Sequence, residues 1–348
     1  MPVFVTGGTG FLGLNLVRLL VERGHRVRVL VRSNAARLGL DSELIEFVHG
    51  DVTDAASVRR AMDGCDRVYH LAGWVQISPW GAATAHQVNV VGTANVCSAA
   101  LETGVARLVH TSSIATIAAG TLNDPADEGT AWNLRAEGIP YYQSKIGAER
   151  VVLDHVKRGL DAVIVNPTYV VGPWDVKPSA GRMLIQTATR RLRVYPARGG
   201  INFADVRQVA AGHIQAMDKA QAGERYILGG KNLSFESYFS RVAGLAGVPA
   251  PRIGPPYWAM YPFAAAGSLL GRLMPKTFRD LNLCVLTSAF LEHYVSSAKA
   301  VRQLGFDATP IDKAIEDALR WFVDYGYMSR VSGSYRRGAG RITGPVAG

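Results

Sequence analysis

Cysteine is scarce in this chain of 348 residues, which has only Cys65, Cys97 and Cys284, far apart in the sequence. An odd number of scattered cysteines predicts neither a disulfide framework nor a metal cluster. It is typical of proteins in a reducing compartment. We therefore expect a cytoplasmic protein without a metal site.

Charged residues are also missing from residues 253–271, a stretch of 19 residues. This stretch is long enough to raise the question of a membrane span. Pro255, Pro256 and Pro262, together with Gly254 and Gly267, make a continuous helix there unfavourable. We expect a buried or pocket-lining segment that does not span a membrane, with peripheral membrane contact as the alternative.

Acidic residues are in deficit, with 28 Asp and Glu against 38 Lys and Arg, for a net charge of +10. Four arginines lie in the acid-free, glycine-rich end at residues 329–348, which leaves about +6 for the rest. We predict that this end is a flexible basic tail. The remaining charge suits an anionic cofactor and is too diffuse to indicate nucleic-acid binding.

Short β-branched runs alternate with helical patterns through the first half of the chain, which predicts a parallel sheet covered by helices on both faces. The expected strands are Val3–Thr6, Arg26–Val31, Ile45–His49, Arg67–Leu71, Arg107–Ser112 and Ala162–Asn166. The expected helices are Leu12–Glu22, Ala55–Met62, Gln87–Thr103 and Tyr141–Arg158. Beyond Pro167 we expect shorter elements, with strands near Asn202 and at Tyr226–Leu228, and helices at Ser234–Gly247, Ser297–Leu304 and Pro310–Tyr325.

A glycine-rich segment, Thr-Gly-Gly-Thr-Gly-Phe-Leu-Gly at residues 6–13, follows the first predicted strand and precedes the first predicted helix. In this context, glycines permit a tight turn and a close approach of pyrophosphate to the helix N-terminus. The chain therefore reads as a Rossmann-type α/β protein. We expect a dinucleotide-binding domain at 1–167, to which some later segments return, and mainly a smaller α/β substrate lobe at 168–328. Cofactor contacts are expected from Gly7, Thr9, Gly10, Phe11 and Leu12.

The ends of the later strands carry further candidates for cofactor binding. Arg32 stands where an NAD-preferring protein usually has an acidic residue, so we predict a preference for NADP(H) through a 2′-phosphate contact, with NAD(H) as the alternative. Arg32 could instead be a solvated strand-end residue. Asp51 could accept a hydrogen bond from the adenine amino group or simply form a turn. The other candidates are Val52, Leu71, Ala72, Gly73, Asn89, Thr111, Pro167 and Val170.

Ser113, Tyr141 and Lys145 are the candidate catalytic residues. Tyr141 and Lys145 are four residues apart in a predicted helix, so their side chains share one face. A neighbouring ammonium, together with the positive nicotinamide of an oxidised cofactor, would favour the phenolate of Tyr141. Tyr141 and Lys145 are also expected to contact the cofactor, with Lys145 at the ribose. Ser113 would hydrogen-bond the same substrate oxygen.

These motifs together resemble the extended short-chain dehydrogenase/reductase family. The glycine segment, Asn89-Val90-x-Gly92-Thr93, Thr111-Ser112-Ser113, Tyr141-x-x-x-Lys145 and Asn166-Pro167-Thr168 carry the resemblance. The nearest branches resemble dihydroflavonol 4-reductase-like proteins, 3β-hydroxysteroid dehydrogenases and hopanoid-associated sugar-epimerase-like proteins. The resemblance implies the Ser113, Tyr141 and Lys145 triad, rather than Ser112 or Tyr142. It also implies homodimers formed through the helices at 87–103 and 141–158.

The substrate is the less determined part of the prediction. Trp74, Trp80 and Tyr169, with Ser113, are the candidate substrate contacts, and Tyr257–Phe263 could cover the other side. Aromatic walls favour an apolar small molecule, unless both stretches only pack the lobes together. The leading hypothesis is an NADP-dependent oxidoreductase that interconverts a carbonyl and an alcohol on a dihydroflavonol-, steroid- or terpenoid-like molecule. The alternatives are a nucleotide-sugar epimerase or dehydratase, or a non-catalytic NAD(P)-binding regulator. For a sugar diphosphate, the available arginines are Arg182, Arg190, Arg191, Arg193 and Arg207.

Overall fold

The computed structural model describes residues 1–33, 40–134, 138–278 and 280–329. The tail predicted at 329–348 therefore lies outside the described residues except for Ser329. Its main element is a seven-stranded sheet in the order β3-β2-β1-β4-β5-β6-β9, in which every neighbouring pair is parallel. The strands are β1 (Val3–Thr6), β2 (Val27–Val31), β3 (Ile45–His49), β4 (Arg67–His70), β5 (Arg107–Thr111), β6 (Ala162–Pro167) and β9 (Arg225–Leu228). The predicted Rossmann-type doubly wound sheet is confirmed.

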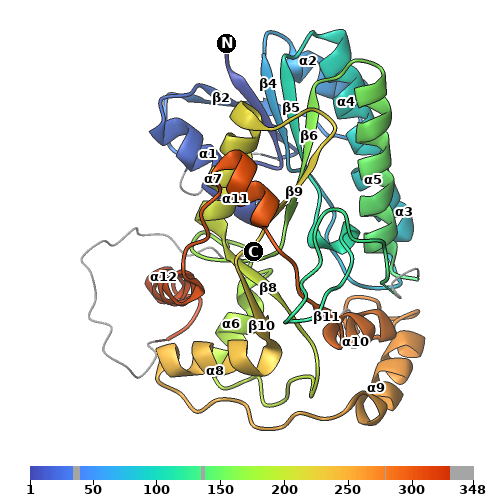
Figure 1. Ribbon diagram of the computed structural model, residues 1–348, viewed down its shortest axis with the longest axis vertical. Coiled ribbons are helices and arrows are strands. Elements are labelled where there is room, and N and C mark those ends of the chain that lie inside the picture. Colours follow the sequence, from blue (N-terminus) through green and yellow to red (C-terminus); the bar gives the residue numbers. More distant parts are fainter. Residues whose placement is uncertain (34–39, 135–137, 279, 330–348) are drawn as a thin grey trace.

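Helices cover both faces of this sheet (Figure 1). On one face lie α1 (Phe11–Glu22), α7 (Val206–Lys219) and α11 (Ala298–Leu304). On the other lie α2 (Ala55–Met62), α4 (Gly92–Glu102) and α5 (Pro140–Lys157). Each face has its own apolar core, built from the inward side chains of strands and helices, as a buried parallel sheet requires.

A second lobe is built around a four-stranded sheet. Its strands are β7 (Tyr169–Val171), β8 (Gly200–Asp205), β10 (Lys231–Ser234) and β11 (Glu292–His293). The helices α6 (Gly181–Ala188), α8 (Phe235–Ala246) and α12 (Ile311–Asp324) pack on it around a separate aromatic-rich core. A helical pair, α9 (Tyr257–Leu270) and α10 (Leu283–Ala289), projects from this lobe (Figure 1).

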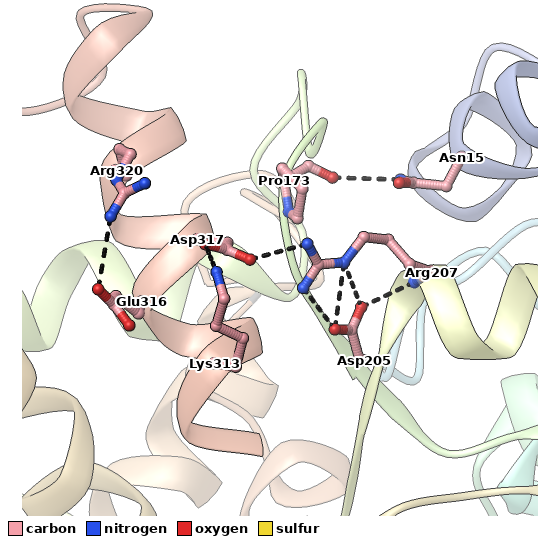
Figure 2. A network of polar contacts seen from close by, with 8 residues as sticks. All are labelled: Asn15, Pro173, Asp205, Arg207, Lys313, Glu316, Asp317 and Arg320. Carbon is pink, nitrogen blue, oxygen red and sulfur yellow. Dashed lines mark hydrogen bonds and ion pairs between the residues drawn. The ribbon is translucent and has the colours of Figure 1, made fainter. Parts of the chain in front are cut away.

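Polar contacts bind β8, α7 and α12 together within this part of the molecule (Figure 2). Arg207 contacts Asp205 at 2.6 Å and Asp317 at 2.7 Å, so one guanidinium joins the end of β8 to α12. Asn15 of α1 donates a hydrogen bond to the Pro173 carbonyl oxygen at 3.1 Å. The two lobes are therefore joined by side-chain contacts as well as by the chain itself.

Two sequence expectations are corrected by the fold. The helix expected at Gln87–Thr103 begins as a π-helical turn, η1 (His86–Val91), continues as α4, and is preceded by the short helix α3 (Ala82–Ala85). The stretch 253–271 contains the helix α9, and most of its large side chains are exposed rather than buried. Pro256 caps α9 at its start, so of the prolines only Pro262 lies inside the helix. Among the described residues, no helix has the length and apolar character needed to cross a bilayer.

Candidate active site

The glycine-rich turn between β1 and α1 is shaped by contacts that only glycine permits. Gly7 has φ 72°, and an added Cβ would lie 2.5 Å from the Ala72 nitrogen. At Gly13 an added Cβ would lie 2.1 Å from the Gly7 carbonyl oxygen. Because both glycines are required by close packing, the turn brings the end of β1 directly against the end of β4.

Gly10 differs from these two glycines. An added Cβ there would meet only the Gly7 carbonyl oxygen, at 3.3 Å, and Gly10 is exposed. It is the N-cap of α1, no side chain caps this helix, and its first turn has no acidic residue. The uncapped N–H groups at this end favour an anion. The turn therefore fits the pyrophosphate of a dinucleotide, with Thr9, Phe11 and Leu12 bordering it.

Residues at the ends of β2 and β3 lie along the same sheet edge. Arg32 and Ser33 follow β2 and are exposed. The Asp51 carboxylate accepts hydrogen bonds from the Thr53 backbone N–H and hydroxyl, both at 2.9 Å, so Asp51 does form the turn after β3. Val52 is buried against Gly92 of α4.

Asn89 lies in the π-helical turn η1, is only 2% exposed, and fastens two parts of the site. Its side chain accepts a hydrogen bond from the Trp74 N–H at 2.7 Å and donates to the Trp74 carbonyl oxygen at 3.0 Å. It also donates to the Ser144 hydroxyl of α5 at 2.8 Å. Single π-helical turns recur at functional sites because they redirect a side chain from the regular helical position.

Lys145 reaches the sheet edge from α5. Its ammonium donates a hydrogen bond to the Thr111 carbonyl oxygen at 3.0 Å. An added Cβ on Gly73 would lie 3.3 Å from both the Lys145 nitrogen and the Asn89 oxygen. The structure therefore brings Gly73, Asn89, Thr111 and Lys145 together where β4 and β5 end.

Tyr141 lies one helical turn before Lys145 and is buried. Its phenol interacts with the Ser113 side chain, which acts to lower the pKa of Tyr141. The residues Ser113, Tyr141 and Lys145 therefore meet in one place. Tyr142 is also buried, with its ring edge-on to that of Tyr141 at 5.9 Å between centroids.

A buried carboxylate, Glu149, fixes the segment that carries Ser113, and the sequence arguments missed it. Glu149 accepts hydrogen bonds from the Thr116 hydroxyl at 2.6 Å and from the Asn166 amide at 2.8 Å. Thr116 and Asn166 in turn both donate to the Ser113 carbonyl oxygen. The available signal was the position of Glu149, four residues after Lys145 on the same helical face.

Burial shifts the pKa values of both Tyr141 and Lys145. It raises the pKa of Tyr141 to about 12, although the Ser113 contact opposes this rise. It lowers the pKa of Lys145 to about 8, although the carboxylate of Glu149 opposes the fall. Without the cofactor, desolvation therefore outweighs the Ser113 contact at Tyr141. The expectation that Lys145 and an oxidised nicotinamide together favour the phenolate concerns the cofactor complex and stays a prediction.

Apolar side chains surround Tyr141. Its cluster includes Ile139 and Tyr142 and is joined by residues from distant parts of the chain. Those residues are Ile77, Leu134, Cys284 and Leu291. These four residues could not be assigned to the site from the sequence. Nothing local to Cys284 or Leu291 indicates that α10 and the residues that follow it pack beside α5.

The candidate substrate residues lie in different settings. The Trp74 ring packs on Gly81, and the Trp80 ring packs on Gly271 at the end of α9. Tyr169 donates a hydrogen bond to the Ala180 carbonyl oxygen at 2.8 Å and packs edge-on against Phe203. Leu71 and Ala72 extend from β4, whereas Pro167 ends β6 and Val170 lies in β7.

Comparison with known proteins gives results that agree with this geometry. The model of the NAD dependent epimerase/dehydratase family matches residues 3–229. The chain is 35% identical to a putative dihydroflavonol 4-reductase of Synechocystis, over 93% of this chain and 95% of that protein. It is 34% identical to sterol demethylase protein B of Methylococcus capsulatus, over 94% of this chain and all of that protein.

Solved structures agree as well. The structure of gox2253 superposes with a TM-score of 0.81 at 34% identity and covers 94% of this chain and 99% of its own. That of PA4631, a nucleoside-diphosphate-sugar epimerase of Pseudomonas aeruginosa, gives 0.76 at 25% identity, with 94% and 99% covered. The resemblance found in the sequence and the expectation of an NAD(P)-dependent enzyme are confirmed. This chain belongs to the NAD dependent epimerase/dehydratase family, within the extended short-chain dehydrogenases/reductases.

Proposed function

We propose that this enzyme interconverts a carbonyl and an alcohol on an apolar small molecule and prefers NADP(H). The observation that carries the proposal is the meeting of Ser113, Tyr141 and Lys145 inside an apolar cluster. A bound nicotinamide would supply or accept the hydride. The glycine turn, Gly73, Asn89, Thr111 and Lys145 would hold the cofactor.

The protein's own residues would position the substrate oxygen and move one proton. Ser113 would donate a hydrogen bond to that oxygen, and the Tyr141 hydroxyl would give or take its proton. A phenol of high pKa is predominantly protonated at neutral pH, which suits proton donation to a carbonyl oxygen. Glu149 acts as a positioning residue, because it holds Thr116 and Asn166 against the Ser113 backbone.

The preference for NADP(H) rests on Arg32. Arg32 is exposed at the end of β2, next to the glycine turn, and Val31 before it has no carboxylate to accept hydrogen bonds from a ribose. A guanidinium there would make charge-assisted hydrogen bonds to a 2′-phosphate.

Support for an apolar substrate comes from the cluster around Tyr141 and from the names of relatives. A protein of Mus musculus, sterol-4-alpha-carboxylate 3-dehydrogenase, is 29% identical over 91% of this chain. The two relatives named above are described as acting on a dihydroflavonol and in sterol demethylation. These names share a carbonyl or alcohol on an apolar ring system.

Nucleotide-sugar epimerisation or dehydration is the second candidate, supported by the family model. Two of the arginines available for a diphosphate already have carboxylate partners. Arg182 contacts Asp280 at 2.6 Å, and Arg207 is held between Asp205 and Asp317. Arg190, Arg191 and Arg193 are exposed and remain available.

The test measures NADPH oxidation in the presence of a panel of steroid, flavonoid and long-chain carbonyl compounds. In parallel, thermal-shift measurements test whether nucleotide sugars bind. The proposal predicts turnover of at least one apolar carbonyl compound. If a nucleotide sugar stabilises the protein and no apolar carbonyl compound is turned over, the oxidoreductase proposal is wrong and the second candidate takes its place. The homodimer through α4 and α5 belongs to the same proposal, and light scattering of the purified protein tests it.

A further inference from the structure

The helix α9 presents a broad apolar surface to solvent. Trp258 is 76% exposed, Phe263 68%, Leu269 63% and Leu273, just beyond the helix, 84%. We call these four residues, with Leu270, the outer face of α9. The opposite side of the helix, at Ala264 and Gly267, is buried next to the segment before α10. Contiguous exposed apolar patches of this kind mark interaction sites.

The sequence stretch that contains the outer face carries charges of one sign. No acidic residue occurs between Glu236 and Asp280. Within that interval Arg252, Arg272 and Lys276 are exposed. Tyr257 and Tyr261, both partly exposed, add phenol groups of the type found at membrane interfaces. An exposed apolar face accompanied by cations and tyrosines of the same segment is complementary to an anionic lipid surface.

The same charge pattern argues against a second copy of the chain as the occupant. In a two-fold symmetric contact, each patch faces its own copy. Arg272 and Lys276 would then face like charges, with no carboxylate from the same stretch to neutralise them.

We propose that the outer face of α9 docks on the surface of a bilayer that contains anionic phospholipid. The helix would lie in the plane of the interface, with Trp258, Phe263 and Leu273 among the acyl chains and Arg272 and Lys276 at the phosphates. With its 14 residues and Pro262 inside it, α9 anchors the protein at the surface and does not cross the bilayer.

The docking surface is continuous with the candidate active site. The Trp80 ring packs on Gly271 at the end of α9, and an added Cβ there would lie 2.0 Å from that ring. Cys284 of α10 joins the apolar cluster around Tyr141. If the proposed function is right, an apolar substrate dissolved in the lipid would reach the site from the docked face. The docking itself does not depend on that function.

The test is vesicle flotation of the full-length protein without substrate. Vesicles of phosphatidylcholine alone are compared with vesicles in which roughly a third of the lipid is phosphatidylglycerol. We expect binding to the anionic vesicles, and a loss of about tenfold in the partition coefficient for the double variant Phe263→Asp, Leu273→Asp. The matched control is Val301→Asp on α11, a valine 49% exposed on the other lobe, which should bind as the parent does.

Three results would overturn the proposal. The first is no binding of the parent protein to either vesicle. The second is unchanged binding of the double variant, which would assign the attraction to other parts of the chain such as the basic end. The third is a parent protein that is dimeric by light scattering, becomes monomeric in the double variant, and does not float with vesicles, which would make the outer face a contact between copies. Circular dichroism of the double variant serves as the control that it is folded. Because no turnover enters these measurements, failure of the proposed function leaves their outcome unchanged.

Discussion

Two aromatic segments, the loop at residues 73–80 and the helix α9, look alike in the sequence and differ in the structure. Both are apolar, carry tryptophan and were expected to enclose a substrate. The loop is drawn inward, because the buried Asn89 binds the backbone of Trp74 on both its N–H and its carbonyl oxygen. By contrast, α9 packs mainly against α10 and exposes its larger side chains.

Aromatic composition alone therefore does not distinguish the wall of a site from an outer surface. What decides is whether a buried polar side chain fastens the backbone of the segment. Such a side chain is costly to bury without its partners, so it fixes the segment that satisfies it. The Trp80 ring packed on Gly271 is where the two segments meet.

The largest effect on activity is expected at Tyr141, rather than on the exposed face of α9 in the comparison above. Tyr141→Phe should lower kcat by about a thousandfold, because the proton-transferring oxygen is lost while the ring remains. Cofactor affinity and melting temperature should change little. Tyr142→Phe, which alters the adjacent buried ring, is the control, and a comparable loss in that variant would move the catalytic role to Tyr142.

A smaller effect is expected for the cofactor. Arg32→Ala should weaken NADPH binding by about 1–3 kcal/mol and leave NADH binding nearly unchanged, since only the 2′-phosphate contact is removed. Fluorescence titration of both cofactors measures this. Arg26→Ala, exposed immediately before the same strand, should alter neither affinity. Equal affinities of the parent protein for NADPH and NADH would contradict the assignment.

The two tryptophans test the comparison most directly. Trp80→Ala should lower kcat/KM on an apolar carbonyl compound about tenfold, because a ring beside the substrate contributes more than about 1.4 kcal/mol. Trp258→Ala should leave kcat/KM on the same dissolved compound unchanged when no lipid is present. Equal losses in the two variants would mean that α9 reaches the substrate as well, and would remove the distinction drawn here.

The smallest effect concerns acid stability, and it arises from buried histidines in both lobes rather than from α9. In the smaller sheet, burial lowers the pKa of His293 of β11 to about 4. Burial lowers the pKa of His70 to about 3 and of His213 to about 4, and lowers that of His110 well below its ordinary value. These side chains stay neutral when folded and become protonated when unfolded, so stability is full above about pH 6.5 and falls as the pH decreases. Between about pH 7 and about pH 5 we expect the melting temperature to drop by about 5–10 °C. His213→Gln should reduce this drop, and His49→Gln, at an exposed position, should not.

Most of the sheet and the triad could be predicted from the sequence because their signals are local. Each of the first six predicted strands differs from the observed strand by at most a single residue, since a buried parallel strand reads as a short β-branched run between turns. Tyr141 and Lys145 share a helical face, which their spacing determines.

The parts that could not be predicted depend on contacts between distant segments. The π-helical turn at Asn89 has no local pattern of its own, because the gain from its hydrogen bonds to Trp74 and Ser144 appears only in the folded chain. The position of Cys284 beside Tyr141 requires knowing where α10 packs. The exposure of α9 was not predicted, because the sequence of an uncharged stretch does not show whether the protein core, a substrate or lipid lies against it.

The chain passes repeatedly between the two sheets, from β6 to β7, from β8 to α7, from β9 to β10 and from β11 to α11. A single proteolytic cut at any one of these crossings would leave the lobes covalently joined by the others. For the lobes to swing apart, the backbone at all of these crossings would have to change together, so we expect motion between the lobes to be small. Substrate exchange in this enzyme would then depend on side chains and loops near Trp80, and a fragment ending before β11 would lack a strand of the smaller sheet.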